Sequence, residues 1–304
     1  MHIHPRTQNT LAALLFGALS LGLTTSCQPP SPDESRINPT IFVPDDSADD
    51  TQARNRKGGT HGDDTDNTAD GYHVNLRLLE MPQTHKGEII VHHTGYTLSF
   101  NTSTNCPNWV AWELTRQEAK ARGNRNPDFY ADPDLDERSQ VTTRDYSGSG
   151  MDRGHMCPSA DMRWSTEAQH DCFYMSNMCP QNRDLNANSW EWLERSCRRW
   201  AKKEGSVYIV CGPVFNDWRK VRTIGRDHKV RVPDGFFKVV LSLRNGQEKA
   251  IGFYYANNDR QQTMESAATT VDEIEKMTGY DFFYQVDDLL EKRLETQCDL
   301  RAWD

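Results

Sequence analysis

The chain has 304 residues, with 35 Lys and Arg against 44 Asp and Glu, giving a formal net charge of −9. That length accommodates one large domain or two ordinary ones. The charge excludes a protein that is basic throughout, but it is unevenly spread. Residues 28–71 alone carry ten acidic and four basic side chains, so the net charge says little about the remainder of the chain.

The first 27 residues have the features of a secretory signal. Arg6 precedes an apolar run over 11–23 that is too short to remain as a membrane span. The small residues before Cys27 resemble a bacterial lipobox, in which the cysteine is lipidated and becomes the mature N-terminus; an ordinary secretory peptide cut nearby is the alternative. Both interpretations predict an exported protein that is periplasmic, held at the cell surface through a lipid on Cys27, or secreted.

Residues 28–71 predict a disordered acidic tether. They are rich in Pro, Ser, Thr and Asp and poor in apolar side chains, so they cannot bury enough surface to offset the conformational entropy of folding. No second linker of comparable length and no internal repeat follows. Residues 72–304 are therefore predicted as one domain of the α+β class.

Short apolar segments separated by polar turns predict the strands of this domain. They cover 89–91, 96–100, 109–114, 151–157, 172–178, 207–214, 236–243 and 250–256. The polar stretch over 126–144 predicts a loop. After Asp184 a helix is predicted by one apolar stripe, and a shorter helix over 271–277 ends at Gly279. The stripe consists of Trp190, Leu193, Cys197, Trp200 and Ala201.

His155 is the candidate general base, because histidine is the side chain whose ordinary pKa lies nearest neutral pH. Arg153 lies two residues earlier, so on a strand both side chains project from the same face. A base beside a phosphate-binding guanidinium suits phosphoryl chemistry. Asp152 is predicted to point to the other face as a structural ion-pair partner, and Gly154 to permit a close backbone approach.

Asn186 and Glu194 are candidates for holding a hard cation. Asn186 falls within the apolar stripe of the predicted helix and Glu194 at its edge, where polar groups are costly without partners or ligands. An N-cap role would explain Asn186 or Asn188, but it would not explain Glu194 further along the helix. Mg²⁺ is favoured because it needs few protein oxygens and keeps most of its waters.

Three motifs and one later segment occur together in this order. They are Asp152-Arg153-Gly154-His155, Asn177-x-x-Pro180-Gln181, Asn186-x-x-x-Trp190-x-x-x-Glu194 and 232–238. In composition and spacing they resemble the DNA/RNA non-specific endonuclease family, over about 85–290. The resemblance implies a ββα-metal fold with a central antiparallel sheet flanked by helices. It also implies metal-dependent cleavage of phosphodiester bonds in DNA and RNA with little sequence or sugar preference.

The resemblance also implies a role for each motif residue. His155 would be the general base that takes a proton from water, and Asn186 the direct Mg²⁺ ligand. Glu194 would hold a metal-bound water. Mn²⁺ or another hard divalent ion would suit the same oxygen ligands.

Three further site residues follow from the same resemblance. Arg153 would contact the phosphate, and Asn177 would help to shape the site. Arg138, upstream of the main motif, is taken as the second arginine of the site.

Two local basic patches are candidates for contacts with the nucleic-acid backbone, whatever the net charge of the chain. One lies late in the predicted site helix and comprises Arg195, Arg198, Arg199, Lys202 and Lys203. The preferred one, which contains a single acid, comprises Arg219, Lys220, Arg222, Arg226, Lys229 and Arg231. An ordinary solvated face is the alternative for either patch.

Seven cysteines follow Cys27, and none of them forms a Cys-x-x-Cys pair, which argues against a zinc site. In an exported protein some of these cysteines should form disulfides. Because seven is odd, at least one must stay free or pair elsewhere.

Two other functions remain open. One is a nucleic-acid-binding surface lipoprotein that has lost catalysis, and the other is a toxin or effector nuclease with a cognate inhibitor. The presence of His155, Asn186 and Glu194 together favours turnover over binding alone.

Overall fold

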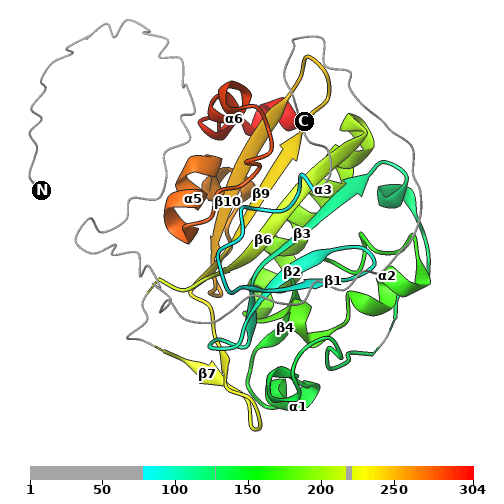
Figure 1. Cartoon of the computed structure of the whole chain (residues 1–304), viewed down its shortest axis with the longest axis vertical. Coiled ribbons are helices and arrows are strands. Elements are labelled where there is room, and N and C mark those ends of the chain that lie inside the picture. The colour runs from blue at the N-terminus through cyan, green and yellow to red at the C-terminus, as the bar shows by residue number, and fades with distance from the viewer. Residues whose placement is uncertain (1–77, 127, 217–220) are drawn as a thin grey trace, which may run out of the picture.

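The computed structural model describes residues 78–126, 128–216 and 221–304 (Figure 1). The predicted signal with Cys27, the predicted tether, and the patch residues Arg219 and Lys220 lie outside the described residues. Within the described ranges, no helix is both long enough and apolar enough to cross a membrane.

Seven strands of the described chain form one antiparallel sheet in the order β1-β2-β3-β6-β9-β10-β11. They are β1 (Ile89–His92), β2 (Thr97–Asn101), β3 (Cys106–Thr115), β6 (Ser206–Val214), β9 (Gly235–Ser242), β10 (Lys249–Ala256) and β11 (Ala268–Thr269). Six of the predicted strands coincide with β1, β2, β3, β6, β9 and β10. The central antiparallel sheet that the sequence predicts is confirmed.

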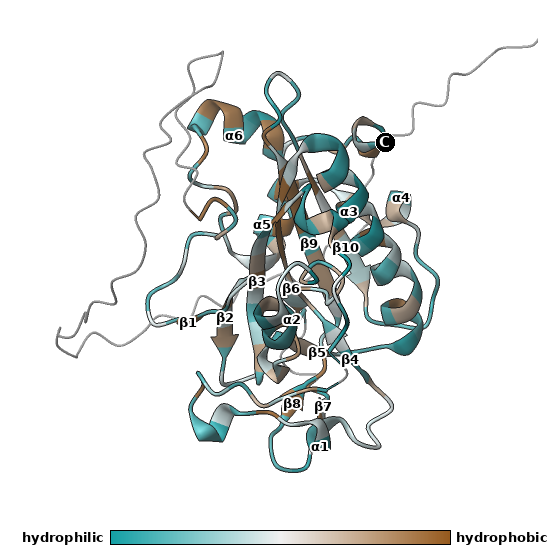
Figure 2. Ribbon diagram, turned by 90° about the vertical axis from the view of Figure 1, so that its right-hand side faces the viewer, coloured by the Kyte–Doolittle hydropathy of each residue, from teal (hydrophilic) through white to brown (hydrophobic). Residues whose placement is uncertain are grey.

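Alternate side chains of the central strands enter two separate apolar cores, because successive residues of a strand face opposite sides. Val110 of β3 packs in the core that also contains Trp190 and Trp200, whereas Ala111 packs in the core that contains Ile274 and Leu290. The first core lies under α3 (Glu191–Glu204), and the second under α5 (Val271–Thr278) and α6 (Asp288–Glu295). Helices therefore flank the sheet on both faces (Figure 2).

The segment that carries the motifs forms a strand, strand, helix unit. β4 (Asp152–His155) and β5 (Met178–Gln181) pair as a separate antiparallel ribbon. The chain then passes through η4 (Leu185–Trp190), a π-helical turn that continues into α3. The predicted apolar stripe of this helix is at most 1% exposed. The structure thus confirms the ββα order and the α+β class.

The strand predicted over 172–178 is wrong for most of its length. Cys172 caps α2 (Thr166–Asp171), and the chain turns through η3 (Met175–Asn177) before β5 begins. The Asn177 side chain stabilises this turn by donating from Nδ2 to the carbonyl oxygens of Cys157 and Cys172, each at 2.9 Å. A short buried turn and a short buried strand have similar apolar patterns, so periodicity does not separate them.

The remaining elements are short. They are η1 (Glu118–Lys120), η2 (Glu137–Ser139), α1 (Thr143–Tyr146), the hairpin of β7 (Thr223–Ile224) and β8 (Val230–Arg231), α4 (Met264–Ala267) and η5 (Leu300–Trp303). The described residues of the polar stretch over 126–144 contain only η2 and the start of α1, which agrees with the predicted loop.

The expectation of disulfides is wrong for the part of the chain that the structure describes, because no disulfide forms there. Six of the seven cysteines are buried. Their thiols fill gaps between strands and helices in the apolar core, as small hydrophobic side chains do. Burial raises the pKa of Cys197 and of Cys211 to about 12, so these two thiols stay protonated at neutral pH.

Candidate active site

The β4–β5 ribbon brings two of the predicted motifs together. Residue pairs across it include Gly154 with Cys179 and Asp152 with Gln181. A Cβ on Gly154 would lie 2.2 Å from the Gln181 Oε1 and 2.6 Å from its Cβ. The close approach predicted for Gly154 is confirmed, because any larger residue there would displace Gln181.

His155 occupies an aromatic setting beside this ribbon. Its ring lies edge-on to Phe173 with the centroids 4.9 Å apart, and it also contacts Phe129 at 5.7 Å. Nε2 is buried and has no hydrogen-bond partner among the described residues. Burial, together with the positive charges of Arg125 and Arg153, lowers the pKa of His155 to about 3. The imidazole is therefore neutral at physiological pH and has a nitrogen that can accept a proton.

Two arginines lie beside His155. The Arg153 guanidinium stacks over Phe129, 4.4 Å from the ring centroid, and its Nε is buried without a partner in the described structure. The Arg125 guanidinium lies 5.2 Å from the centroid of Phe173, the ring that His155 meets edge-on. Two positive charges therefore lie against Phe129 and Phe173, which form an aromatic wall that also contacts the imidazole of His155.

Arg138 was predicted as the second arginine of the site, whereas the arginines whose charges act on His155 in the structure are Arg125 and Arg153. Arg138 is 90% exposed and pairs with Asp136 at 3.1 Å, within the same η2 turn. It is not among the charges that act on His155. Arg125 stands at the start of the predicted loop, where its distance from the main motif hid its relation to His155.

Asn177 fixes the backbone that follows His155. Its Oδ1 accepts from the backbone N–H of Cys157 at 2.9 Å, and the side chain is fully buried. The backbone carbonyl of Asn177 also accepts from the N–H of Met156 at 3.0 Å. Asn177 therefore shapes the ribbon end from behind and has no surface to offer a ligand.

Asn186 and Asp152 form a hydrogen bond that joins η4 to β4. The Asn186 Nδ2 donates to the Asp152 Oδ2 at 3.0 Å. Asp152 was expected to serve an ion pair on the opposite face, and the structure gives it this amide partner instead. Because Nδ2 is engaged, the amide is oriented and its Oδ1 is left to face a ligand.

The capping interpretation of these asparagines is not supported. Asp184 occupies the N-cap position of η4, and no side-chain hydrogen bond caps this turn. Asn188 donates instead to the backbone carbonyl of Asp184 at 3.0 Å. Helix capping therefore does not explain why an asparagine occupies position 186.

Glu194 lies on α3 and is only 9% exposed. Its side chain has no salt bridge within the described chain, although Lys238 and Arg198 are close enough to act on its charge. Burial raises the pKa of Glu194 to about 7, against the opposing effect of Lys238 and then Arg198. A carboxylate in this position gains stability from any further positive charge nearby.

Lys238 on β9 is a buried cation. Of the charges that act on Glu194, it lowers the pKa of that carboxyl most strongly. Its ammonium lies between two indoles, 4.4 Å from the Trp190 centroid and 5.1 Å from that of Trp112. Nζ has no hydrogen-bond partner among the described atoms. Lys238 lies in the segment over 232–238 that resembles the family, but no role was predicted for it, because a lysine within an apolar strand pattern gives no indication of its partners.

Arg198, placed by sequence in a basic patch, is buried in a different interaction. Its Nη1 bonds to the Asp161 Oδ1 at 2.8 Å, and the Trp112 Nε1 donates to the other oxygen of Asp161 at 3.2 Å. This network fixes the inner face of α3 to β3 behind Glu194.

The rest of the patch late in α3 is largely neutralised. Arg195 bonds to Glu191 at 2.6 Å, Arg199 reaches Asp304 at 3.5 Å, and Lys203 donates to the backbone oxygen of Asp304. The second predicted patch keeps Arg222 and Arg226 exposed on and beside the β7–β8 hairpin. In the described structure the first patch keeps one exposed cation without a salt bridge, Lys202, whereas the second keeps both Arg222 and Arg226.

The residues near Asn186 fit a hard cation. The donors are an amide oxygen held in orientation by Asp152 and a buried carboxylate on Glu194, and oxygen ligands of this kind suit Mg²⁺. Burial raises the pKa of Glu194 to about 7 despite the charges of Lys238 and Arg198, so a further cation beside it would stabilise its charged form.

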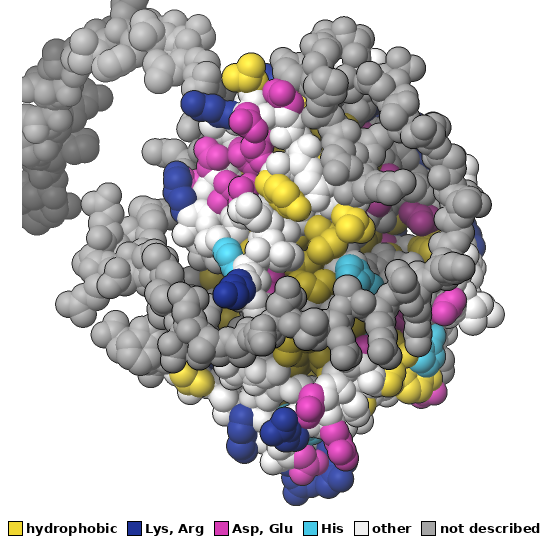
Figure 3. Space-filling model, viewed as in Figure 1, with side chains coloured by type: hydrophobic (Ala, Val, Ile, Leu, Met, Phe, Trp, Pro, Cys, Tyr) yellow, Lys and Arg dark blue, Asp and Glu magenta, His cyan; other side chains and the backbone are white. Residues whose placement is uncertain are grey.

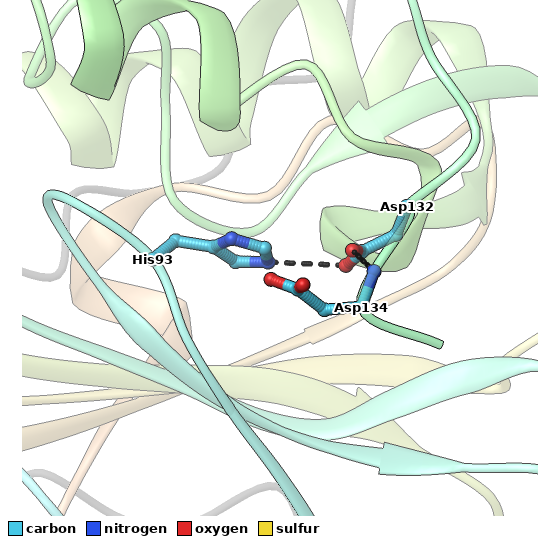
Figure 4. Close-up of side chains that lie close together, drawn as sticks. All are labelled: His93, Asp132 and Asp134. Atoms are coloured by element: carbon cyan, nitrogen blue, oxygen red, sulfur yellow. Dashed lines mark hydrogen bonds and ion pairs between the residues drawn. The ribbon is translucent and has the colours of Figure 1, made fainter. Parts of the chain in front are cut away.

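A second group, His93, Asp132 and Asp134, has ligand atoms within 4.8 Å of one another and could also hold a metal ion (Figure 4). The Asp132 carboxylate already has hydrogen-bond partners on both oxygens. One oxygen of Asp132 accepts from His93 at 3.0 Å and from the Ser176 hydroxyl, and the other accepts from the Asp134 N–H at 3.0 Å. This network ties the turn after β1 to the loop before α1.

A sequence model of the DNA/RNA non-specific endonuclease family matches residues 79–289, which is more than half of the chain. The chain belongs to this family. The matched residues include both strands of the ribbon, the site helix α3 and all seven strands of the central sheet.

Relatives with names and solved structures agree with this membership. "Nuclease 1, mitochondrial" of Schizosaccharomyces pombe is 40% identical over 164 residues, covering 50% of this chain and 51% of that protein. "Nuclease EXOG, mitochondrial" of Xenopus laevis is 33% identical over 222 residues, covering 68% and 61%. The chain thus spans between half and two thirds of the length of these relatives.

The fold also matches a solved structure. The crystal structure of the EndoG/EndoGI complex contains a chain with a TM-score of 0.60 and 26% sequence identity, covering 65% of this chain and 86% of that chain. The ββα-metal fold implied by the sequence motifs is confirmed by this likeness together with the observed β4, β5 and α3.

Proposed function

We propose that this protein is a metal-dependent endonuclease that hydrolyses phosphodiester bonds in DNA and RNA with little sequence or sugar preference. One observation supports it above all: the His155 Nε2 is buried, unpartnered and neutral, and it lies on the same aromatic wall as two arginines. Family membership and relatives named as nucleases support the same reaction class.

In this mechanism His155 is the general base. Its neutral imidazole accepts a proton from the attacking water, while Arg153 and Arg125 bind the phosphate oxygens. With a pKa of about 3, the free imidazole is a weak base. An anionic phosphate between the two arginines would offset their charges and raise the pKa of His155, so substrate binding itself would strengthen the base.

The metal ligand in the proposal is the Oδ1 of Asn186, with Glu194 holding a metal-bound water. Mg²⁺ bound there would stabilise negative charge that develops on the phosphate and on the leaving oxygen. Asp152 keeps the amide of Asn186 in the orientation that exposes its oxygen. Mn²⁺ would satisfy the same oxygen donors.

The nucleic-acid backbone would extend from the site toward the β7–β8 hairpin, where Arg222 and Arg226 are exposed. Arg219 and Lys220 are close to these two arginines in the sequence and are included in the same proposed contact. Contacts of this kind recognise phosphates and carry little base information, which accords with low sequence specificity.

Export also remains part of the proposal. The apolar run over 11–23 and the small residues before Cys27 support a cleaved leader, with a lipid anchor on Cys27. An acidic tether over 28–71 would then separate a nuclease domain over 72–304 from the membrane surface, in the periplasm or at the cell surface.

The decisive experiment follows cleavage of plasmid DNA and of RNA by the purified protein, with Mg²⁺ and with EDTA. We expect both substrates to be cut with Mg²⁺, and cleavage to be lost with EDTA and in His155→Ala. His92→Ala is the matched control, because His92 is exposed at the end of β1, and its ring bonds to Thr97 on β2. Binding of nucleic acid without turnover under any divalent ion would instead favour a binding lipoprotein.

A further inference from the structure

Acidic side chains gather where α5 and α6 meet, as Figure 3 shows in magenta on the upper part of this face. We call these five carboxylates the α5–α6 cluster: Asp272, Glu275, Asp281, Glu291 and Glu295. They form two groups of three that share Glu295. In each group, one carboxylate oxygen per residue lies within 4.8 Å of the others.

No salt bridge joins the cluster to a basic side chain within the described residues. Two basic side chains on the same helices pair elsewhere: Lys276 with Glu273 at 2.6 Å, and Arg293 with Glu248 at 3.7 Å. Five carboxylates therefore face one another without a salt bridge. Close like charges of this kind destabilise a fold unless something else neutralises them.

Glu295 provides a second, independent observation. Its residue is 8% exposed, and its Oε1 is buried without a hydrogen-bond partner in the described structure. The Oε1 of Glu291 is in the same condition. A buried carboxylate oxygen with no donor carries a large desolvation cost, so an unfilled partner is expected at this point.

Two agents could fill that role: protons or a metal ion. Burial, followed by repulsion from Glu275, raises the pKa of Glu295 to about 9, and burial raises that of Glu291 to about 7. Some carboxyls would therefore be protonated at neutral pH when no metal is bound. Protons alone, however, would leave up to five acidic side chains crowded together, whereas one ion would engage several of them at once.

The chemistry of the donors points to calcium. Every donor is a carboxylate oxygen, and no histidine or cysteine belongs to the cluster, so a softer ion such as Zn²⁺ is disfavoured. Ca²⁺ binds six to eight oxygens at roughly 2.3–2.6 Å and tolerates irregular geometry. Oxygens that all lie within 4.8 Å of one another are close enough to bind a single ion of this size.

We propose that the α5–α6 cluster binds one Ca²⁺ ion that bridges the two helices. This site is separate from the active site, because α5 and α6 cover one face of the sheet and α3 covers the other. The ion would stabilise the packing of α5 and α6 on the sheet, through Ile274 and Leu290, and would take no part in phosphodiester cleavage.

The test is calorimetric titration of the full, chelator-treated chain with CaCl₂, paired with thermal unfolding in CaCl₂ and in EDTA. We expect one Ca²⁺ bound and a Tm raised by roughly 5–10 °C when free Ca²⁺ is about a hundredfold above Kd. Glu295→Gln and Glu275→Gln should each lose both effects. Glu273→Gln, which changes a neighbouring, partly exposed glutamate outside the cluster, should retain them.

Asn186→Ala separates this site from the proposed catalytic metal, because it should keep the Ca²⁺-dependent rise in Tm. Equal Ca²⁺ responses in the wild type and in both cluster variants would overturn the proposal. Loss of the response in Asn186→Ala alone would also overturn it. No Ca²⁺ binding at all would mean that protons neutralise the cluster, and tighter binding of MgCl₂ than of CaCl₂ would overturn the assignment of the ion.

Discussion

The side-chain amide of Asn186 is bonded to the carboxylate of Asp152 at 3.0 Å, which ties the start of the site helix to the first strand of the ribbon. An amide can rotate by half a turn and exchange its oxygen and nitrogen. Here the acceptor Asp152 selects one orientation, because a carboxylate repels the amide oxygen. The oxygen of Asn186 is thereby presented to the site before any ligand arrives.

Asp152→Ala should therefore weaken metal dependence without removing the ligand itself. We expect the Mg²⁺ concentration for half-maximal cleavage to rise by roughly 10- to 100-fold, with a smaller loss of rate at saturating Mg²⁺. Titration of the cleavage rate with Mg²⁺ measures this. Asp184→Ala removes a nearby carboxylate that does not bond to Asn186, and it should leave the Mg²⁺ dependence unchanged.

Glu194→Gln should abolish Mg²⁺-dependent cleavage and should raise the stability of the fold above neutral pH. The folded-state pKa of Glu194 is about 7, above its ordinary value of 4.5, so the folded protein holds this proton more tightly than the unfolded chain. Stability is then lost as pH rises from 4.5 through 7, by at most about 3 kcal/mol. The glutamine variant, having no charge to bury, avoids this loss.

Thermal unfolding in EDTA at two pH values checks the prediction. Near pH 5 the wild type and Glu194→Gln should differ little, whereas at about pH 8 the variant should melt at the higher temperature. The same variant should lose Mg²⁺-dependent cleavage. A difference in Tm that does not change with pH would contradict the assigned pKa.

Arg125→Ala should lower cleavage of both DNA and RNA by roughly 10- to 100-fold, the cost of losing one charged contact to phosphate. It should also raise the pKa of His155, because one of the two positive charges that depress it is gone. Steady-state cleavage and the NMR titration of the His155 ring measure the two effects. Arg138→Ala should leave both unchanged, since Arg138 pairs with Asp136 in solvent; the reverse pattern would restore Arg138 to the site.

Lys238→Met should shift the pH dependence of cleavage to higher pH. Lys238 is the largest favourable charge acting on Glu194, so its removal should raise the pKa of Glu194 further. A role limited to filling space between Trp112 and Trp190 would change stability and leave the pH profile in place. The pH–rate profile of the variant, with Lys238→Arg as the charge-preserving comparison, distinguishes the two.

The sequence predicted most of the fold because the central strands are long, apolar and bounded by polar turns, and because the stripe from Trp190 to Ala201 has a clear helical period. It failed over 172–178, where burial comes from a turn held by Asn177 rather than from strand pairing. Element type in so short a segment depends on side-chain hydrogen bonds that leave no periodic signal.

The candidate site was predictable only where its residues are close in sequence. Arg153 and His155 share β4, and Asn186 and Glu194 follow further along the chain on η4 and α3, so the order and spacing of the motifs predicted one site. Arg125 reaches the site through a contact with Phe173, and the chain between them passes through a loop. Partners brought together by tertiary packing in this way are invisible to a reading of spacing, and Arg138 was chosen in its place.

The ββα unit also has a consequence for the order of folding. β4, β5, η4 and α3 follow one another along the chain, and the Trp190 indole bonds to the His155 carbonyl at 3.2 Å inside that unit. By contrast, β3 and β6 pair with Ala111 opposite Val210, although the whole ββα unit lies between them in the sequence. Contacts close in sequence form at a lower entropic cost than distant ones.

We therefore expect amides of the β4–β5 ribbon and α3 to gain protection from hydrogen exchange before those that join β3 to β6, as pulse labelling during refolding would reveal. The ββα unit that carries the candidate site residues would then fold first, and the large sheet would form around it afterwards.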